Sequence, residues 1–249
     1  MQPLFPTIAR MSAKFQRGIQ RHGVFGVVGV ALERARYLAA RLRPSTRAQI
    51  LQSNQRARDF DERFGVDTRG NIHPTELAID HPNQVHAAPY GASDPEDVRS
   101  AIASLSINCR DFAFVDFGSG KGRVLLIASE FPFKRITGVE LSEKLHGIAQ
   151  ENINRFSGYK SGCTNVESIC VDALQYPLPF DNLVCYFCNP FDATVMREVV
   201  SNIRRSFLQR PREILILYYN AKHPELFDRE DCFERIRTNG WVVMWRTSK

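Results

Sequence analysis

The chain alternates between short apolar runs and longer stretches in which apolar residues recur every three or four positions. Five apolar runs have the length and composition of buried strands. They cover residues 112–117, 135–141, 166–171, 183–188 and 213–219. Segments with helical periodicity follow three of them, at residues 123–129, 143–156 and 194–207. Strands that alternate with helices in this way predict an α/β fold with a parallel sheet.

Two further signals concern the ends of this pattern. The stretches C-F-E-R-I-R (232–237) and W-V-V-M-W-R (241–246) flank Thr238-Asn239-Gly240, and Asn-Gly between two runs that contain apolar residues predicts a type I′ hairpin. Near the other end, Ser93 and Glu96 fit a capping box, with Pro95 in the first turn of the helix. We therefore expect a helix that begins at Ser93 and a chain that closes on two antiparallel strands.

The first strand leads into Asp116 and then into three glycines at alternate positions, in the stretch D-F-G-S-G-K-G. Glycines let the backbone turn sharply and bring its N–H groups close to a ligand. The last of them, Gly122, comes one residue too early for the dinucleotide pattern G-x-G-x-x-G, and Arg123 stands where that pattern has Gly or Ala. Lys121 is not a P-loop lysine, because Val115 and Gly122 occupy the places of the P-loop glycine and Ser or Thr.

The remaining pattern, D-x-G-x-G-x-G, resembles motif I of the class I S-adenosylmethionine (SAM)-dependent methyltransferases. The resemblance extends over residues 86–249 and implies a doubly wound, Rossmann-like sheet of seven mostly parallel strands that ends in an antiparallel hairpin. It implies SAM as the cofactor. The cofactor-binding residues that it implies are Asp116, Gly118, Ser119, Gly120 and Gly122 in the loop, Glu140, Asp172 and Ala173.

Glu140 and Asp172 each follow a predicted strand. An acid at the position of Glu140 can accept hydrogen bonds from both hydroxyls of a ribose, whereas a structural Glu has no such need. In the methyltransferase pattern the acid after the third strand, here Asp172, accepts a hydrogen bond from the adenine amino group, and a backbone N–H beside it serves the ring. An Asp at this place is also a common turn former.

The fourth strand leads into Asn189-Pro190-Phe191. This N-P-F is similar to the [D/N/S]-P-P-[Y/F] tetrad of amino-group methyltransferases but lacks the second proline. It also resembles the N-N-F of non-SET histone-lysine methyltransferases of the disruptor-of-telomeric-silencing type. Tyr90 resembles the pre-motif aromatic residue of several methyltransferases, in which this segment folds over the SAM pocket. The predicted catalytic residues are Asn189, Pro190, Phe191 and Tyr90; a plain turn and a core tyrosine are the alternatives.

These motifs predict transfer of a methyl group to a nitrogen, with a protein lysine as the leading acceptor. A small-molecule acceptor, such as a lipid or glycan precursor, stays open. A nucleic-acid acceptor is not favoured, because no RNA-binding motif or basic–aromatic interleaving is present. A SAM-binding module without enzymatic activity would have no need of N-P-F.

Charge divides the 249 residues unevenly. Residues 1–58 carry eleven Arg or Lys and one acid, a net charge of +10, while the remainder carries 22 basic and 26 acidic residues, or −4. We interpret 1–58 as a basic helical extension, 59–89 as a connecting segment and 90–249 as the methyltransferase domain. The extension could contact a membrane surface, dock an acidic partner, cover the catalytic domain or simply present a solvated basic face. Its apolar stretch, 24–32, is too short and glycine-broken to span a bilayer.

The cysteines and histidines do not predict a metal site. Cys185 and Cys188 lie in one predicted strand, where residues three apart point to opposite faces. His73, His81 and His86 match no familiar ligand spacing, and His-Pro pairs indicate turns. Reduced, structural cysteines favour a cytoplasmic protein, peripheral at a membrane if the extension binds one. No cleaved signal peptide is expected, although the Arg-rich start could serve as an organellar transit peptide.

Overall fold

The computed structural model describes residues 44–77, 79–157, 162–239 and 241–248. The chain divides into two compact units, residues 1–52 and 53–249. Within the described ranges no helix is long and apolar enough to cross a membrane. The apolar stretch at 24–32 and most of the predicted basic extension lie outside these ranges, so the roles considered for the extension stay predictions.

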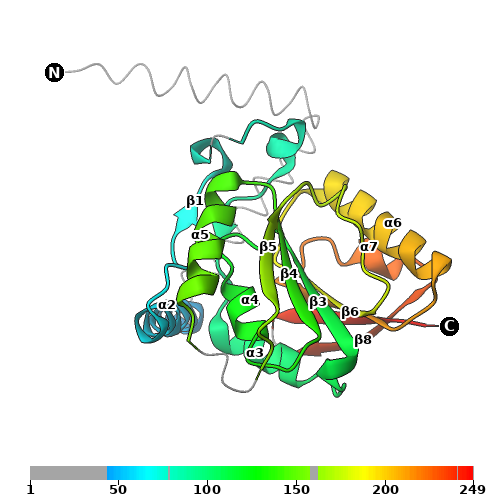
Figure 1. Cartoon of the computed structure of the whole chain (residues 1–249), viewed down its shortest axis with the longest axis horizontal. Helices are drawn as coiled ribbons and strands as arrows, with labels where there is room; N and C mark the ends of the chain where they lie inside the picture. Colours follow the sequence, from blue (N-terminus) through cyan, green and yellow to red (C-terminus); the bar gives the residue numbers. More distant parts are fainter. Residues whose placement is uncertain (1–43, 78, 158–161, 240, 249) are drawn as a thin grey trace. The chain divides into compact units, whose positions relative to one another are not determined.

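A seven-stranded sheet is the frame of the second unit, with the order β5-β4-β3-β6-β7-β9-β8 (Figure 1). The first five strands in this order are parallel, and β9 runs antiparallel to both β7 and β8. The strands are β3 (Phe112–Phe117), β4 (Arg135–Glu140), β5 (Val166–Cys170), β6 (Asn182–Phe187), β7 (Ile214–Tyr219), β8 (Phe233–Asn239) and β9 (Val242–Thr247). The predicted mostly parallel sheet with a terminal antiparallel hairpin is confirmed. Residue 240, in the predicted type I′ turn, is not among the described residues.

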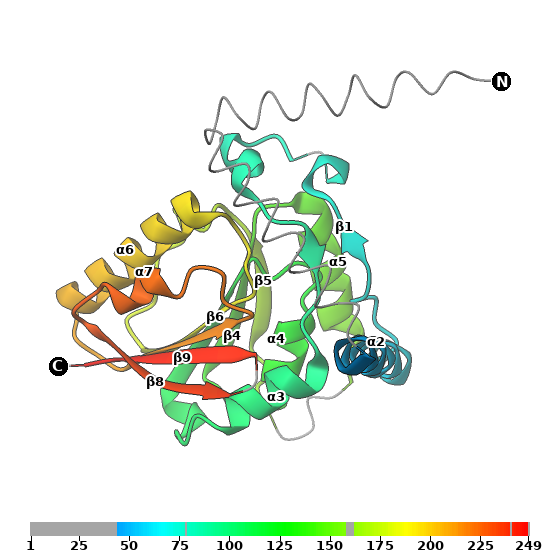
Figure 2. The ribbon, with the colours of Figure 1, turned by 180° about the vertical axis from the view of Figure 1, so that it is seen from behind.

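Helices cover both faces of this sheet. Helices α3, α4 and α5 lie on one side, and α6 and α7 lie on the other, as Figures 1 and 2 show from opposite directions. Their bounds are α3 (Pro95–Ala103), α4 (Arg123–Ala128), α5 (Glu143–Arg155), α6 (Ala193–Gln209) and α7 (Glu225–Asp228). A short 3-10 turn, η3 (Cys109–Asp111), precedes β3. This double winding confirms the predicted architecture and places the carboxyl ends of the parallel strands at one edge, where such folds bind ligands.

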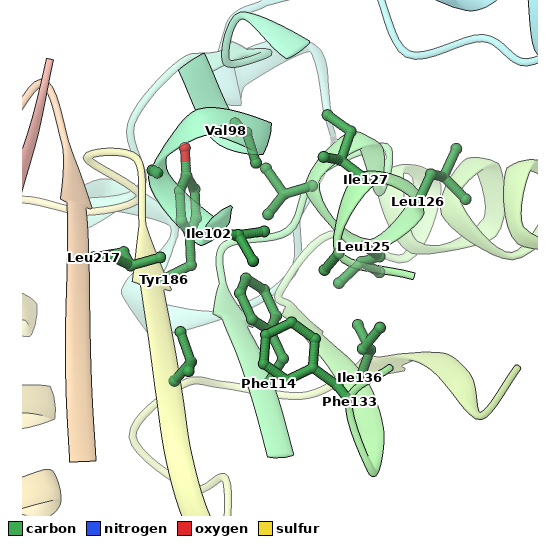
Figure 3. Close-up of a cluster of buried hydrophobic side chains, with 14 of the residues drawn as sticks. Val98, Ile102, Phe114, Leu125, Leu126, Ile127, Phe133, Ile136, Tyr186 and Leu217 are labelled. Atoms are coloured by element: carbon green, nitrogen blue, oxygen red, sulfur yellow. The ribbon is translucent and has the colours of Figure 1, made fainter. Parts of the chain in front are cut away.

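Two apolar cores follow from the alternation of side chains along the strands. Phe114 of β3 packs with Ile102 of α3 and Leu125 of α4 on one face of the sheet (Figure 3). The next residue, Val115, belongs to the opposite core with Met196 of α6. Strands buried on both faces read as continuous apolar runs, which is why the strands could be found from the sequence.

The segment between residues 59 and 89 has structure of its own. Helix α2 (Pro44–Phe64) continues into it, and the aromatic rings of Phe60, Phe64 and Phe156 lie 4.6–6.2 Å apart. The strands β1 (Asn71–Ile72) and β2 (Tyr90–Gly91) form an antiparallel pair, with the 3-10 turns η1 (Pro74–Glu76) and η2 (Pro82–His86) between them. The histidines of the two His-Pro pairs, His73 and His81, are the N-caps of these turns.

The prediction that Ser93 caps helix α3 is wrong. Asp94 is the N-cap, and its Oδ1 accepts hydrogen bonds from the N–H groups of Glu96 and Asp97 at 2.9 and 3.4 Å. The Ser93 hydroxyl instead accepts a hydrogen bond of 2.8 Å from the hydroxyl of Tyr186, 93 residues further along the chain. A local capping pattern cannot reveal such a distant partner.

Candidate functional site

A cleft of about 970 Å³, partly open to solvent, lies at the carboxyl ends of β3, β4, β5 and β6. The cleft is lined by every predicted site residue except Gly122, which caps α4 and packs against Ala149. The predicted residues at its wall are Asp116, Gly118, Ser119, Gly120, Glu140, Asp172, Ala173, Asn189, Pro190, Phe191 and Tyr90.

Glycine is required in the loop after β3 for two reasons. Gly118, Gly120 and Gly122 have φ values of +76°, +56° and +84°, which residues with a Cβ rarely adopt. In addition, a Cβ on Gly118 would lie 2.2 Å from Pro190 Cβ, and one on Gly120 would lie 2.3 Å from the Tyr90 ring. The loop therefore touches both predicted catalytic segments directly.

Glu140 ends β4 with its carboxylate held by the backbone of two loops. One oxygen accepts a hydrogen bond from Gly120 N and the other from Ser142 N, each at 2.8 Å. Burial raises the pKa of Glu140, and these N–H donors oppose part of that rise. Each carboxylate oxygen has a second lone pair, so both can still accept a hydrogen bond from a ligand hydroxyl.

Asp116 is the second buried carboxylate of the cleft, with only 2% of its surface exposed. Burial, and then the charge of Glu140, raise the pKa of Asp116 well above its ordinary value. Beside it, the hydroxyl of Ser119 is buried without a hydrogen-bond partner among the described residues. A buried hydroxyl of this kind is costly unless a ligand supplies its partner.

Asp172 follows β5 and joins it to η2. Its carboxylate accepts hydrogen bonds from the Leu174 N–H at 2.9 Å and from the Asn83 amide at 2.7 Å, and His81 Nε2 lies 3.7 Å away. Asn83 lines the same cleft, and nothing in its sequence context had indicated this. The contact spans 89 residues, so only the folded chain reveals it.

Asn189 is one of three described non-glycine residues with positive φ, at +48°. Its amide nitrogen donates to the carbonyl of Asn220 at 2.7 Å, and its amide oxygen accepts from the N–H of Lys222 at 3.1 Å. Asn220 also has a positive φ, of +49°. The Asn189 side chain thus joins the end of β6 to the loop after β7.

The segment before β2 pairs with N-P-F across the mouth of the cleft. The N–H of Ala88 donates to the Pro190 carbonyl at 3.0 Å, and Ala87 forms an antiparallel bridge with Phe191. His86 contacts Asp192 twice. Its carbonyl accepts a hydrogen bond from the Asp192 N–H at 2.9 Å, and its ring Nδ1 lies 2.8 Å from the Asp192 carboxylate. These bonds join residues 86–88, shortly before Tyr90, to N-P-F and Asp192.

The two cysteines of C-x-x-C lie on opposite faces of the sheet, as their spacing predicts. Cys185 belongs to the core under α6, and Cys188 packs against the core under α3 and α4. No three His, Cys, Asp or Glu side chains of the described ranges are grouped to hold a metal ion.

The polar groups of the cleft fit the parts of S-adenosylmethionine. Glu140 offers oxygen lone pairs for two ribose hydroxyls, and Asp172 offers them for an amino group on an adenine ring. Asp116 and the Ser119 hydroxyl lie beside the glycine loop, where the amino-acid part would be held. The individual roles of these residues stay predictions.

Comparisons with known proteins give a family match and structures with a similar fold. Residues 70–163 match the family model of the histone methylation protein DOT1. A search of curated proteins finds no match. Solved structures with a similar fold include the ribosomal protein L11 methylase of Lactobacillus delbrueckii subsp. bulgaricus, with 12% identity, 64% of this chain and 80% of that chain covered, and a TM-score of 0.46.

Two further solved structures with a similar fold are TrmN from Thermus thermophilus and a predicted N6-adenine-specific DNA methylase from Listeria monocytogenes. TrmN has 17% identity and a TM-score of 0.44, with 60% of this chain and 48% of that chain covered. The Listeria protein has 11% identity and a TM-score of 0.48, with coverages of 63% and 51%. The chain therefore spans about half the length of these two.

The DOT1 match contains the glycine loop and Glu140. The sheet order and the terminal hairpin are those that the methyltransferase resemblance implies. Together they identify the chain as a class I SAM-dependent methyltransferase, with S-adenosylmethionine as its cofactor and with similarity to the DOT1 histone methylation proteins.

Proposed function

We propose that this enzyme methylates an amine nitrogen and that its acceptor is a lysine side chain of a protein. The observation that carries the proposal is the position of Asn189-Pro190-Phe191, which lines the cleft at the end of β6 and touches the glycine loop. The DOT1 match supports it independently, because that match ends at residue 163 and does not include N-P-F.

The cofactor supplies a methyl group on a positively charged sulfur. The lone pair of the acceptor nitrogen forms the new N–C bond while the C–S bond breaks and its electron pair stays on sulfur. The surplus proton of the methylated amine leaves to solvent. The protein's part is to hold the acceptor in line and to keep its amine unprotonated, since an ammonium has no lone pair.

Two oxygens at the end of β6 are suited to that task. The Asn189 amide oxygen accepts one hydrogen bond from Lys222 N, and the Pro190 carbonyl accepts one from Ala88 N, so each keeps a second lone pair for the acceptor's N–H groups. Phe191 and the half-buried ring of Tyr90 would lower the amine pKa by excluding water. Neutral hydrogen-bond acceptors and apolar walls suit an amine better than a phosphate or carboxylate.

The test incubates the protein with methyl-labelled SAM and cell extract, then separates protein, nucleic acid and organic-soluble material. Label in protein that is recovered as methyl-lysine after acid hydrolysis is the expected result. A parallel reaction with Glu140→Ala, which should not bind SAM, controls for other methyltransferases in the extract. Label confined to the organic phase, or removed by nuclease, would overturn the lysine assignment in favour of a lipid or glycan precursor or of a nucleic acid.

A further inference from the structure

The two basic side chains of the glycine loop are both buried. Lys121 is 6% exposed and Arg123 is 3% exposed. Neither residue matches a nucleotide-binding loop, and neither has a role in the methyltransferase pattern. Burying a cation is costly unless it is paired and hydrogen-bonded, so their partners indicate what these residues do.

Lys121 holds the segment that follows α2. Its Nζ donates to the two carboxylate oxygens of Asp67 at 2.9 and 3.0 Å and to the carbonyl of Arg69 at 2.8 Å. Asn152 of α5 completes this contact, because its amide accepts from Asp67 N and donates to the carbonyls of Asp67 and Lys121, at 2.8–2.9 Å. Residues 67–69 are thus fixed to the back of the glycine loop.

Arg123 holds the residue in the middle of this segment. Its Nε donates to the hydroxyl of Thr68 at 2.7 Å, and one of its terminal nitrogens donates to the carbonyl of Ser93 at 3.1 Å. Asp61 completes the cluster: it lies 3.5 Å from the Arg123 guanidinium and accepts hydrogen bonds from the N–H groups of Thr68 and Arg69 at 3.0 and 3.1 Å. Thr68 is fully buried as a result.

Thr68 in turn holds Tyr90. The Tyr90 hydroxyl donates to the Thr68 carbonyl at 2.7 Å, and the ring of Tyr90 covers Gly120 so closely that a Cβ there would lie 2.3 Å from it. The contacts therefore form a closed circuit, from Gly120 to Tyr90, to Thr68, to Arg123 and back along the loop to Gly120.

We propose that Arg123 and Thr68 are positioning residues for the cofactor: they hold Tyr90 over the glycine loop and thereby set the affinity of the cleft for SAM. Arg123, the basic residue directly after Gly122, thus helps to hold Tyr90, whose ring covers Gly120 of the same loop. The proposal concerns SAM binding and does not depend on which acceptor is methylated.

Two variants test it. Arg123→Lys keeps the charge, but a single ammonium cannot replace donors aimed at both Thr68 and Ser93. Tyr90→Phe removes only the hydroxyl that reaches Thr68. By calorimetric titration with SAM we expect the dissociation constant to rise about tenfold in Arg123→Lys and about fivefold in Tyr90→Phe, the effect of losing one or two hydrogen bonds. The SAM dissociation constant of the double variant should be at most about tenfold above that of the parent protein, because both changes break the same circuit.

Arg212→Lys is the matched control. Arg212 is also an extensively bonded arginine, with donors to the carbonyls of Pro179, Asp181 and Ser206, but it precedes β7, at the amino ends of the parallel strands and so opposite the cleft. The Arg212→Lys substitution should lower the melting temperature and leave the SAM dissociation constant unchanged. In SAM-free protein, amide hydrogen exchange of Ala87, Ala88, Tyr90 and Gly91 should be faster in Arg123→Lys and unaltered in Arg212→Lys.

A stability role alone would give a different result. If Tyr90→Phe binds SAM as the parent protein does, or if Arg123→Lys loses only thermal stability, the circuit does not position the cofactor site and the proposal is overturned. If Arg123→Lys does not fold, Tyr90→Phe decides the question by itself, because it retains the ring that covers Gly120.

Discussion

Pro190 lies directly against Gly118, so the loop after β3 and the loop after β6 meet with no side chain between them. A Cβ at Gly118 would lie 2.2 Å from Pro190 Cβ and 3.3 Å from its Cα. The first distance is far below a van der Waals contact, and the proline ring is fixed to its backbone. The predicted cofactor loop and the predicted methyl-transfer loop therefore form one rigid contact.

Gly118→Ala should disrupt this contact. The φ of +76° costs roughly 1–2 kcal/mol for a residue with a Cβ, and the collision with Pro190 adds about 1–3 kcal/mol of overpacking. We expect the free energy of unfolding, measured in urea, to fall by about 2–5 kcal/mol, together with a loss of SAM binding.

Gly147→Ala provides the control. Gly147 lies inside α5, and nothing stands within 4 Å of the position its Cβ would take. The substitution should raise the free energy of unfolding by about 0.5–1 kcal/mol, because alanine is the better helix former. A Gly118→Ala protein as stable as the parent would show that the two loops can separate.

The second prediction concerns the Asn189 amide and compares its effect on turnover with its effect on SAM affinity. Asn189→Asp keeps an oxygen for the Lys222 N–H but loses the donor to the Asn220 carbonyl. Asn189→Ala loses both, and alanine tolerates the φ of +48° less well. We expect turnover to fall at least about tenfold in either variant while the SAM dissociation constant changes less than about twofold, because the amide lies at the acceptor side.

Turnover and SAM affinity should be compared with those of Asn220→Gly, which keeps the backbone carbonyl and relieves the φ of +49°. That variant should retain most of its activity. Equal turnover in Asn189→Ala and the parent protein would exclude Asn189 from the mechanism.

Much of the cleft could be predicted because its residues are adjacent to strong local signals. Buried strands such as Phe112–Phe117 are continuous apolar runs, and parallel strands bring their carboxyl ends to one edge. Asp116, Glu140, Asp172 and Asn189 each lie in the last positions of such a strand or just after it, so they converge once the sheet forms.

The rest depends on partners far apart in the sequence. Asn83 contacts Asp172, and Lys121 contacts Asp67, across 89 and 54 residues. After α2 ends at Phe64, residues 65–89 show little periodicity in the sequence, and polar contacts of this kind help to order them. The capping of α3 by Asp94 was missed for the same reason, because Ser93 is occupied by Tyr186.

Asn83 should contribute to SAM binding by holding the carboxylate of Asp172. Its amide donates at 2.7 Å from η2, and both residues line the cleft. Asn83→Ala should raise the SAM dissociation constant about fivefold, close to the value of one hydrogen bond, as measured by calorimetry. Asn202→Ala removes a comparable amide bond, 3.2 Å long, from Asn202 to the Leu174 carbonyl and should not alter the dissociation constant. Tighter binding by Asn83→Ala would mean that Asn83 competes with the cofactor for Asp172.

The last prediction concerns pH and the buried carboxyl of Asp116. Burial raises its pKa in the folded protein above the ordinary value of 3.8, with the charge of Glu140 as a second cause. The folded state therefore holds the proton more tightly than the unfolded state does. Its contribution to stability is fully present below pH 3.8 and is lost as the pH rises through the folded-state pKa.

Asp116→Asn removes this penalty without changing the shape of the side chain. In SAM-free protein, its free energy of unfolding should exceed that of the parent protein, and the excess should grow as the pH rises from 3.8 through the folded-state pKa of Asp116. The variant should also lose SAM affinity if Asp116 orients the amino group of the cofactor. A stability difference that shrinks as the pH rises would mean that the Asp116 carboxylate is stabilised in the folded protein, contrary to its burial.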